Sequence, residues 1–473
     1  MRLLLLLLAA TFPALGASEG KPNILLLLSD DQSWNGLSVA MHPEISVSKS
    51  SFVQTPHLAT LASKGMRFSH AYSPAPVCSP TRISLQTGMT NARLRWTKAA
   101  PNLSPTAGYA LIAPSHRKDL RSDETTIAEV LRSAGYATAH FGKWHIGGGG
   151  PESHGYDASD GDNGNEVSGR FAGDNPVDIV GMGERANAFM KKSKEAGKPF
   201  FIQMSYHALH SPGNANPKTI AKYQKLMPDA PERSVQRAAI ADDLDTGVGK
   251  LLDDLEALDL ADTTWVIYTS DNGGGGGGRS RGGERGLQGG KGSLGEGGIR
   301  VPLIIRGPDI PADSWCHQQV VGYDFFPTFC ELAGVTSLPA DLDGESIVAQ
   351  VQGSSAPIER ASTGLVFHFP HYQGKTPHSA IYVDDFKLIK FYETGKLELF
   401  DIRKDTLEAT DLSARMPEKA KELERLLDAY LKDVKADLPT PNPQAIDGKS
   451  YDPRSAKTAQ PGGSKRARGA KRR

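Results

Sequence analysis

Residues 21–31 read KPNILLLLSDD, and this stretch decides the fold. It is a continuous apolar run that ends abruptly at two aspartates, Asp30 and Asp31. A strand covered on both faces by helices has this composition, because neither of its faces meets water. The run therefore predicts a central strand of a parallel sheet, with the two aspartates at its carboxyl end.

Further along the chain, helical and strand-like patterns alternate. We expect helices over residues 125–134, 183–196 and 234–258, and apolar strands over 136–141, 199–206, 264–269 and 301–305. Alternation of this kind predicts an α/β fold: a large mixed, mostly parallel sheet sandwiched by helices. We assign this catalytic domain to residues 21–335.

The pattern changes after residue 335. Three short strands are predicted at close spacing, over 379–384, 386–391 and 396–401, and residues 417–434 form one amphipathic pattern that starts with proline. Short strands joined by turn residues indicate an antiparallel meander, and proline is favoured at the first helical position. We therefore expect a smaller C-terminal antiparallel α+β subdomain over residues 336–438.

The two ends of the chain have distinctive compositions. Residues 1–17 begin with a basic residue, continue with an apolar run and end in small residues, which predicts a secretory signal peptide. The run is shorter than the ~20 residues that span a bilayer. We therefore expect an exported protein, periplasmic or secreted, with no membrane span. Residues 439–473 end in SKRARGAKRR and predict a disordered basic tail.

Charge and cysteine content exclude other classes of protein. The chain has 54 Lys and Arg against 54 Asp and Glu, so its formal net charge is zero and a nucleic-acid partner is not expected. Its three cysteines are too few for a disulfide framework or a four-cysteine zinc site. Whether Cys316 and Cys330 pair is left open by the sequence.

Polar residues follow a second apolar strand as well. Asp271 and Asn272 come after the strand predicted at 264–269, as Asp30 and Asp31 come after the first. Ligands of open α/β sheets bind beyond the carboxyl ends of the strands. Either pair alone is most simply explained as turn or helix-capping residues. Together they predict a site of oxygen ligands suited to Ca²⁺ or Mg²⁺.

The segment PVCSPTRISLQTG, residues 76–88, contains a cysteine next to a predicted helix start at Pro80. The N-terminus of a helix favours a thiolate or another anion. An isolated cysteine is usually a small buried apolar residue, but Pro80 and Arg82 beside Cys78 argue against that interpretation. The residues alone indicate an activated cysteine in an anion-binding site.

At these residues the chain resembles the sulfatase family, of the arylsulfatase type within the alkaline phosphatase superfamily. The family signature C-x-P-x-R, followed by T-G, is present as Cys78, Pro80 and Arg82 with Thr87 and Gly88. The resemblance covers residues 21–413. It includes GKWHIG at 142–147, YHALHSP at 206–212, SDNG at 270–273 and KGSLGEGGIRVP at 291–302.

The resemblance implies a specific chemistry at Cys78. In the family this cysteine is oxidised to formylglycine by a maturation machinery that reads the C-x-P-x-R segment. One hydroxyl of the hydrated aldehyde attacks sulfur, the ester oxygen leaves, and loss of the proton from the second hydroxyl expels sulfate. The implied substrate is a sulfate ester, which we expect to be a sulfated carbohydrate.

The family's site residues can be assigned one by one. Asp30, Asp31, Asp271 and Asn272 match the metal ligands, with the modified Cys78 as a further ligand. Arg82 matches the residue that holds formylglycine, and Lys143 and Lys291 match the lysines that contact sulfate. His145 matches the base for the second hydroxyl, and His210 matches the histidine on the leaving-group side.

Two other functions remain open from the sequence. A phosphonate or phosphate-diester hydrolase of the same superfamily can use the same nucleophile, but no second set of Asp and His ligands for a two-zinc site is evident. A non-catalytic carbohydrate-binding relative would require Cys78 to stay a thiol, and the complete set of motifs argues against it.

Overall fold

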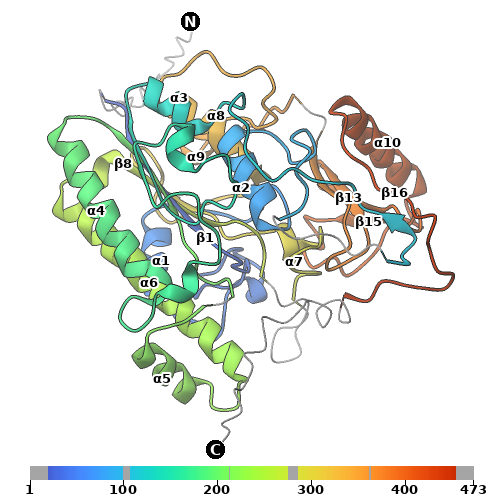
Figure 1. The fold of residues 1–473 in the computed structure, drawn as a ribbon, viewed down its shortest axis with the longest axis horizontal. Coiled ribbons are helices and arrows are strands. Elements are labelled where there is room, and N and C mark those ends of the chain that lie inside the picture. Colours follow the sequence, from blue (N-terminus) through green and yellow to red (C-terminus); the bar gives the residue numbers. More distant parts are fainter. Residues whose placement is uncertain (1–19, 100–106, 212, 275–285, 362–363, 454–473) are drawn as a thin grey trace, which may run out of the picture.

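A computed structural model describes residues 20–99, 107–211, 213–274, 286–361 and 364–453 (Figure 1). The predicted signal peptide at residues 1–17 and the basic residues from 465 onward lie outside these ranges. The chain forms a large α/β unit and, beside it, a smaller unit that contains β13, β15 and α10.

The stretch quoted above forms the central strand of the main sheet. β1 (Asn23–Ser29) lies between β8 (Thr264–Ser270) and β7 (Phe200–Ser205), parallel to both, and β5 (Ala137–Gly142) continues the parallel order. The full order is β10-β2-β9-β8-β1-β7-β5-β6. The remaining strands are β2 (Met66–Phe68), β6 (Ala158–Ser159), β9 (Ile304–Arg306) and β10 (Ser314–Cys316).

β9 runs antiparallel to both β8 and β2, so the sheet is mixed but mostly parallel, as predicted. The strand expected at 301–305 begins three residues later than predicted.

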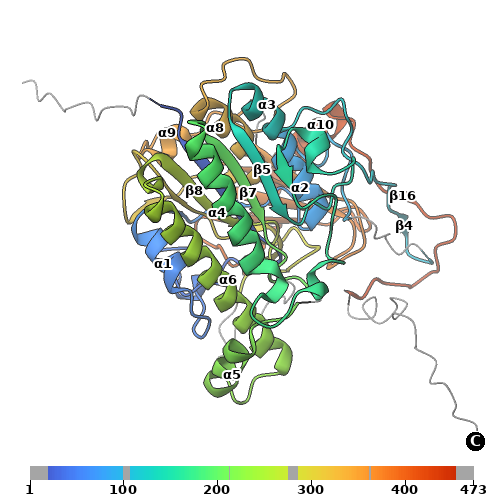
Figure 2. The same cartoon turned by 60° about the vertical axis from the view of Figure 1, so that its left-hand side comes forward.

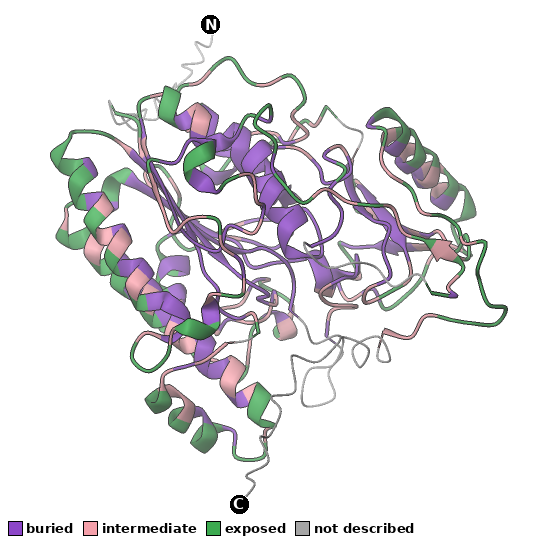
Figure 3. Cartoon of the chain, viewed as in Figure 1, coloured by how far each residue is buried: buried purple, intermediate pink, exposed green. Residues whose placement is uncertain are grey.

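Helices cover both faces of the sheet, which explains why β1 is apolar at successive positions. Leu25 and Leu27 pack toward α1 (Pro56–Ser63), α4 (Ile179–Glu195) and α6 (Glu232–Ala257). Ile24 and Leu26 pack on the other side, toward α2 (Cys78–Thr87), α3 (Ile127–Ser133) and α8 (Phe325–Leu332). Figure 2 shows α4 and α6 side by side along one face, and Figure 3 shows that the strands between the layers are buried.

The C-terminal unit contains the three predicted strands and one that was not predicted. β12 (Leu365–Phe369), β13 (His378–Val383), β14 (Phe386–Phe391) and β15 (Leu397–Asp401) form an antiparallel sheet. α10 (Pro417–Asp433) packs its leucines against one face of this sheet. The opposite face packs against the main unit, where Phe367 and Tyr382 meet Tyr72.

Structure continues past residue 439, where the predicted tail begins. β16 (Thr440–Pro441) pairs with β4 (Leu111–Ile112), and the ring of Tyr451 packs against Tyr109 and Tyr372. Burial of the apolar tyrosine rings offsets the entropy cost of ordering this part of the chain. The basic residues at the C-terminus have no apolar area of that kind to bury. Among the described residues, no helix is both long and apolar enough to cross a bilayer.

A buried carboxylate fixes α1 against α6. The first turn of α1 receives no side-chain cap from Thr55, the residue before it. Instead, Asp245 of α6 accepts hydrogen bonds from the main-chain N–H groups of His57, at 3.1 Å, and Leu58, at 2.8 Å. The two helices are therefore held together by a cap that comes from 187 residues further along the chain.

We predict that Asp245→Ala lowers the free energy of unfolding by about 1–3 kcal/mol, because two N–H groups at the start of α1 lose their acceptor. Chemical denaturation monitored by circular dichroism measures the change. Asp253→Ala, an exposed position on the same helix, is the matched control and should stay within about 0.5 kcal/mol of the unsubstituted protein. Equal losses in the two variants would contradict the capping role.

Candidate active site

The carboxyl ends of four adjacent parallel strands form one edge of the main sheet. Ser29 of β1 is level with Ser270 of β8, and Gly142 of β5 is level with Ser205 of β7. The residues after these strands therefore emerge at a common edge, where ligands of open α/β sheets bind. They are Asp30 and Asp31 after β1, Asp271 and Asn272 after β8, His210 after β7, and Lys143 and His145 after β5.

The turn after β1 has an unusual backbone. Asp31 has φ of +62°, the left-handed region, which aspartate tolerates better than most residues. The N–H of Asp30 donates to the carbonyl of Ala208 at 2.7 Å, and the N–H of Leu209 donates to the carbonyl of Asp30 at 2.9 Å. The guanidinium of Arg237 donates to the carbonyl of Asp31. These bonds hold the turn in a conformation that brings both carboxylates to the same cluster.

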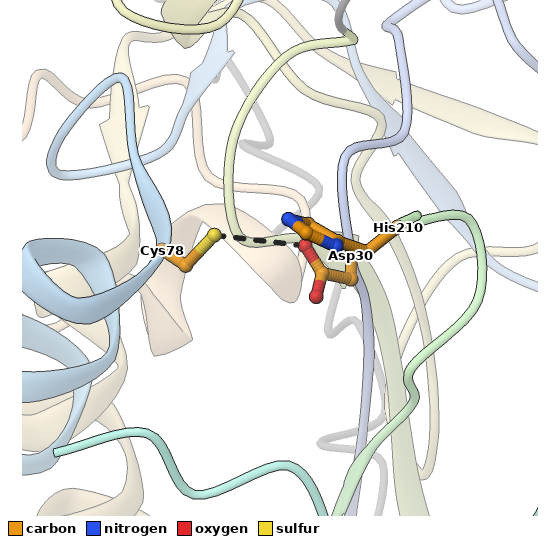
Figure 4. Close-up of side chains that lie close together, drawn as sticks. All are labelled: Asp30, Cys78 and His210. Carbon is orange, nitrogen blue, oxygen red and sulfur yellow. Dashed lines mark hydrogen bonds between the residues drawn. The ribbon is translucent and has the colours of Figure 1, made fainter. Parts of the chain in front are cut away.

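Cys78 is the first residue of α2, confirming the prediction that it lies at a helix N-terminus. The turn before it is fixed by the hydroxyl of Thr81, which donates to the carbonyl of Ala75 at 3.0 Å. Its Sγ lies 3.7 Å from Oδ1 of Asp30 and 3.2 Å from Nζ of Lys291. Figure 4 shows the sulfur directed at Asp30, with the ring of His210 close by.

The thiol of Cys78 is poorly suited to act as a nucleophile without modification. Burial raises its pKa to about 12, although the positive charges of Lys143 and Lys291 act in the opposite direction. The side chain is 1% exposed. Because the thiolate is the reactive form of cysteine, burial disfavours the nucleophilic form of an unmodified Cys78.

Three carboxylates surround this sulfur. Ligand atoms of Asp30, Asp31, Asp271 and Cys78 all lie within 4.8 Å of one another. Asn272 joins them, because its amide nitrogen donates to Oδ1 of Asp31 at 2.7 Å. Its amide oxygen is buried and accepts no hydrogen bond from the residues that the structure describes. A buried oxygen without a donor, next to carboxylates, is a position at which a cation fits.

Each carboxylate also has a basic partner. Lys143 donates to Oδ2 of Asp30 at 2.6 Å, and Lys291 donates to Oδ1 of Asp31 at 2.6 Å. Asp271 accepts hydrogen bonds from Nε and Nη2 of Arg82 at 3.1 and 2.8 Å. The remaining guanidinium nitrogen of Arg82 donates to the main-chain carbonyl of Lys143 at 2.6 Å, which ties α2 to the end of β5.

The ionisation of the carboxylates reflects this crowding. Burial opposes the charge of Asp30, but Lys143 and His210 hold its pKa well below the ordinary value. Burial and the neighbouring charge of Asp30 raise the pKa of Asp271, only partly offset by Arg82. The three basic partners match the three carboxylates in number, yet the pKa of Asp271 is still raised, so a bound cation would stabilise its charged form.

His210 is held in one tautomer by its neighbours. Its Nδ1 lies 2.5 Å from the carbonyl of Ser211, which can only accept, so Nδ1 carries a proton. Burial lowers the pKa of His210, which favours the neutral ring. Nε2 is then an acceptor, and it lies 3.2 Å from the amide nitrogen of Asn165 and 4.0 Å from Oδ2 of Asp31.

His145 is placed on the loop after β5, two residues beyond Lys143. It is half-buried with φ of +63°, and its main-chain N–H donates to the carbonyl of Asn163 at 2.8 Å. The backbone of Gly164 lies against its ring. The direct contacts described above join the other predicted residues in one cluster. The catalytic and ligand roles assigned to these residues and to His145 stay predictions.

Two residues of the site were not found by sequence reasoning. Asn165 contacts His210 from an irregular loop, and Arg237 reaches Asp31 from the second turn of α6. Neither belongs to a motif or follows a strand, so the sequence carried no signal for them. Cys316 and Cys330, whose pairing was left open, are separate buried thiols.

Comparison with known proteins identifies the family. A family model described as Sulfatase matches residues 22–335, and one described as N-sulphoglucosamine sulphohydrolase, C-terminal, matches residues 283–437. N-acetylgalactosamine-6-sulfatase of Canis lupus familiaris is 32% identical over 74% of this chain and 70% of its own length. Arylsulfatase A of Homo sapiens is 30% identical over 78% of this chain and 74% of its own length.

Solved structures share the fold. The crystal structure of Ps i-CgsB in complex with k-i-k-neocarrahexaose superposes with a TM-score of 0.70, at 24% identity over 88% of this chain and 93% of that chain. A structure in complex with D-glucosamine-2-N,6-O-disulfate gives a TM-score of 0.64, at 21% identity over 88% of this chain and 98% of that chain. From its sequence, its fold and the first family model, the chain belongs to the sulfatase family, and it is an enzyme that hydrolyses sulfate esters.

Proposed function

We propose that this protein is an exported sulfatase that removes sulfate from sulfated carbohydrates, using formylglycine made from Cys78 and one divalent cation. One observation carries the proposal: the first residue of α2 lies in direct contact with Lys291 and within 4.8 Å of the ligand atoms of three aspartates. Carbohydrate substrates are supported by relatives named N-acetylgalactosamine-6-sulfatase and by neighbours solved with sulfated sugars. The signal-like residues 1–17 support export.

The proposed cation is Ca²⁺, with Mg²⁺ as the second candidate. Asp30, Asp31, Asp271, Asn272 and the modified residue 78 would hold it, because hard oxygen ligands suit both ions. When bound, it supplies Lewis-acid polarisation of the oxygens that it contacts. The three basic partners of the carboxylates already cancel their charge, so a divalent ion leaves the site net positive and attractive to a sulfate ester.

Modification of Cys78 is supported by the chemistry of the site. Burial disfavours the thiolate of Cys78, so the unmodified side chain is a poor nucleophile. The hydrate of formylglycine would supply a hydroxyl at the same position. Pro80 and Arg82 stand at the offsets that the family's maturation machinery reads. Arg82 would also hold the modified side chain, since its guanidinium already reaches Asp271 beside it.

The remaining residues bind sulfate and move protons. Lys143 and Lys291 would contact sulfate oxygens and neutralise the charge that develops on them. His145 would take the proton of the second hydroxyl. His210 would donate a proton to the leaving ester oxygen. Burial lowers the pKa of His210, and the charges of Asp30 and Asp31 act in the opposite direction by favouring the protonated ring. The products are an alcohol and inorganic sulfate.

The alternative is a phosphonate or phosphodiester hydrolase. Among the described residues, the only groups of three or more His, Cys, Asp or Glu that could hold a metal belong to this single cluster. One cation site favours the sulfatase over a two-zinc phosphatase. A non-catalytic carbohydrate-binding relative would leave the lysine and carboxylate cluster without a use.

We predict that active protein carries formylglycine at position 78. Peptide mass spectrometry of the segment around residue 78 should show an aldehyde or its hydrate in place of the thiol. Cys78→Ala should fold normally but lose activity toward an aryl sulfate by about a thousandfold or more. Cys316→Ala, which removes another buried thiol, is the matched control and should keep its activity. Full activity in protein whose Cys78 is entirely unmodified would refute the mechanism.

We predict that chelation of divalent ions abolishes turnover and that Ca²⁺ or Mg²⁺ restores it. Asp271→Ala should lose both stoichiometric metal and activity, because one of three carboxylate ligands is gone and Arg82 loses its partner. Elemental analysis and sulfate release measure the two effects, with Asp253→Ala as an exposed control. Unchanged turnover by metal-free protein would contradict the proposal that a divalent cation is required. Stoichiometric zinc in the purified protein would favour the phosphatase function.

A further inference from the structure

A buried lysine lies beside the catalytic loop without an acidic partner. Lys98 is 4% exposed, and its Nζ donates to Oε1 of Gln373 at 2.5 Å. The ammonium also lies 5.5 Å from the centre of the ring of Phe369. Among the described residues, no carboxylate comes within ion-pair distance of it. An amide oxygen and an aromatic face are weak compensation for a buried positive charge.

Lys98 is surrounded by groups that can donate hydrogen bonds. His371 shares a hydrogen bond of 2.7 Å with the hydroxyl of Thr97, and its ring lies 6.1 Å from that of His116. Nε2 of His116 is buried and has no hydrogen-bond partner among the described residues. His116 is half-buried and lines a cavity of about 790 Å³, and it is the member of the cluster that meets this cavity. Among the described residues, neither Lys98 nor His116 forms an ion pair with a carboxylate.

The ionisation of the cluster is consistent with a missing anion. Burial lowers the pKa of Lys98 to about 7. Burial also lowers the pKa of His116 and takes that of His371 well below its ordinary value, with Lys98 acting in the same direction on both. The titratable groups that face Lys98 are therefore these two neutral imidazoles. A bound anion would stabilise the ammonium form of Lys98.

This cluster is one side chain away from the catalytic loop. The side chain of Gln373 lies directly against Gly292, so closely that a Cβ added to Gly292 would be 2.4 Å from Cγ of Gln373. Gly292 follows Lys291, and its N–H donates to the carbonyl of Pro76 at 2.9 Å, two residues before Cys78. Gln373 therefore joins Lys98 to the loop that carries Lys291.

We propose that Lys98, with His116 and Gln373, binds a second anionic group of the substrate. This subsite takes a carboxylate or a second sulfate on the sugar next to the ester that is cleaved. The inference rests on the proposed function, because it presupposes a sulfated carbohydrate. It makes Lys98 a residue that determines specificity, and it narrows the substrate to carbohydrates with at least two anionic groups.

Paired substrates test the subsite. One pair is a sulfated disaccharide with a uronic acid and its carboxyl-reduced counterpart, and the other is a disulfated disaccharide and its monosulfated counterpart. Lys98→Met should raise KM for the substrate with two anionic groups by about tenfold or more, while KM for the other substrate of that pair stays nearly unchanged. The value of kcat should change little for either substrate. The pair that responds identifies the anion as carboxylate or sulfate.

The matched control is Lys191→Met, which removes an exposed charge from α4, a helix that contributes no residue to the cluster. It should change KM for both members of each pair equally. Equal effects of Lys98→Met on both members, or no effect on either pair, would overturn the subsite. If the unsubstituted protein cleaves an aryl sulfate but neither pair, the carbohydrate proposal fails, and this inference fails with it.

Two further measurements separate binding from folding. Lys98→Met should leave the melting temperature unchanged or raise it, since an unpaired buried charge gives way to an apolar side chain of similar size. Gln373→Glu places a carboxylate beside Lys98 and should also raise KM for the doubly charged member. In Cys78→Ala protein at pH 8, calorimetry should show uptake of about one proton per doubly charged disaccharide bound, and the added Lys98→Met change should abolish it. Binding with the same proton uptake in both proteins would contradict the subsite.

Discussion

The mutual repulsion of three buried aspartates is the constraint on which the rest of the structure depends. Their oxygens meet within 4.8 Å beside Cys78, where like charges without partners would be strongly unfavourable. Each is matched by a basic side chain from a different part of the chain: Lys143 after β5, Arg82 in α2 and Lys291 before α7 (Glu296–Ile299). The three ion pairs can form together only when β1, β5 and β8 lie in this order, α2 packs beside them and the loop that contains Lys291 returns to the same edge of the sheet.

The C-terminal unit takes part in this arrangement through a second set of buried charges. Glu296, five residues after Lys291, pairs with Arg300 at 2.5 Å and with Lys387 of β14 at 2.9 Å. Lys387 also contacts Glu408 at 2.7 Å, and Glu408 accepts the main-chain N–H of Glu296 at 2.8 Å. These ion pairs connect the catalytic loop to the antiparallel sheet. The boundary expected near residue 335 therefore separates two patterns of secondary structure that share a buried network of charges.

The features that sequence reasoning predicted well are those with local causes. The run at residues 24–28 is apolar because both faces of β1 are covered, and the three meander strands alternate with turn residues, so each could be located from its own neighbours. The pairs of candidate metal ligands, Asp30 with Asp31 and Asp271 with Asn272, could be predicted to meet because the carboxyl ends of parallel strands lie at one edge of the sheet. What could not be predicted depends on distant partners. β12 is an exception, because it is an apolar run that pairs with the next strand along the chain, β13, and it was nevertheless missed. Asn165 was missed because its role arises only when the loop folds over His210.

The burial of α2 has a consequence for how the protein is made. Every residue of this helix is buried, including the Cys78, Pro80 and Arg82 that the proposed maturation step must recognise. A second protein cannot read a segment that is already packed inside the molecule, so the proposed modification would have to take place before α2 is buried. Folding and maturation then compete during biosynthesis. On the proposed chemistry, a molecule that folds first would stay inactive, and the specific activity of the purified protein would then report how much of it was modified before it folded.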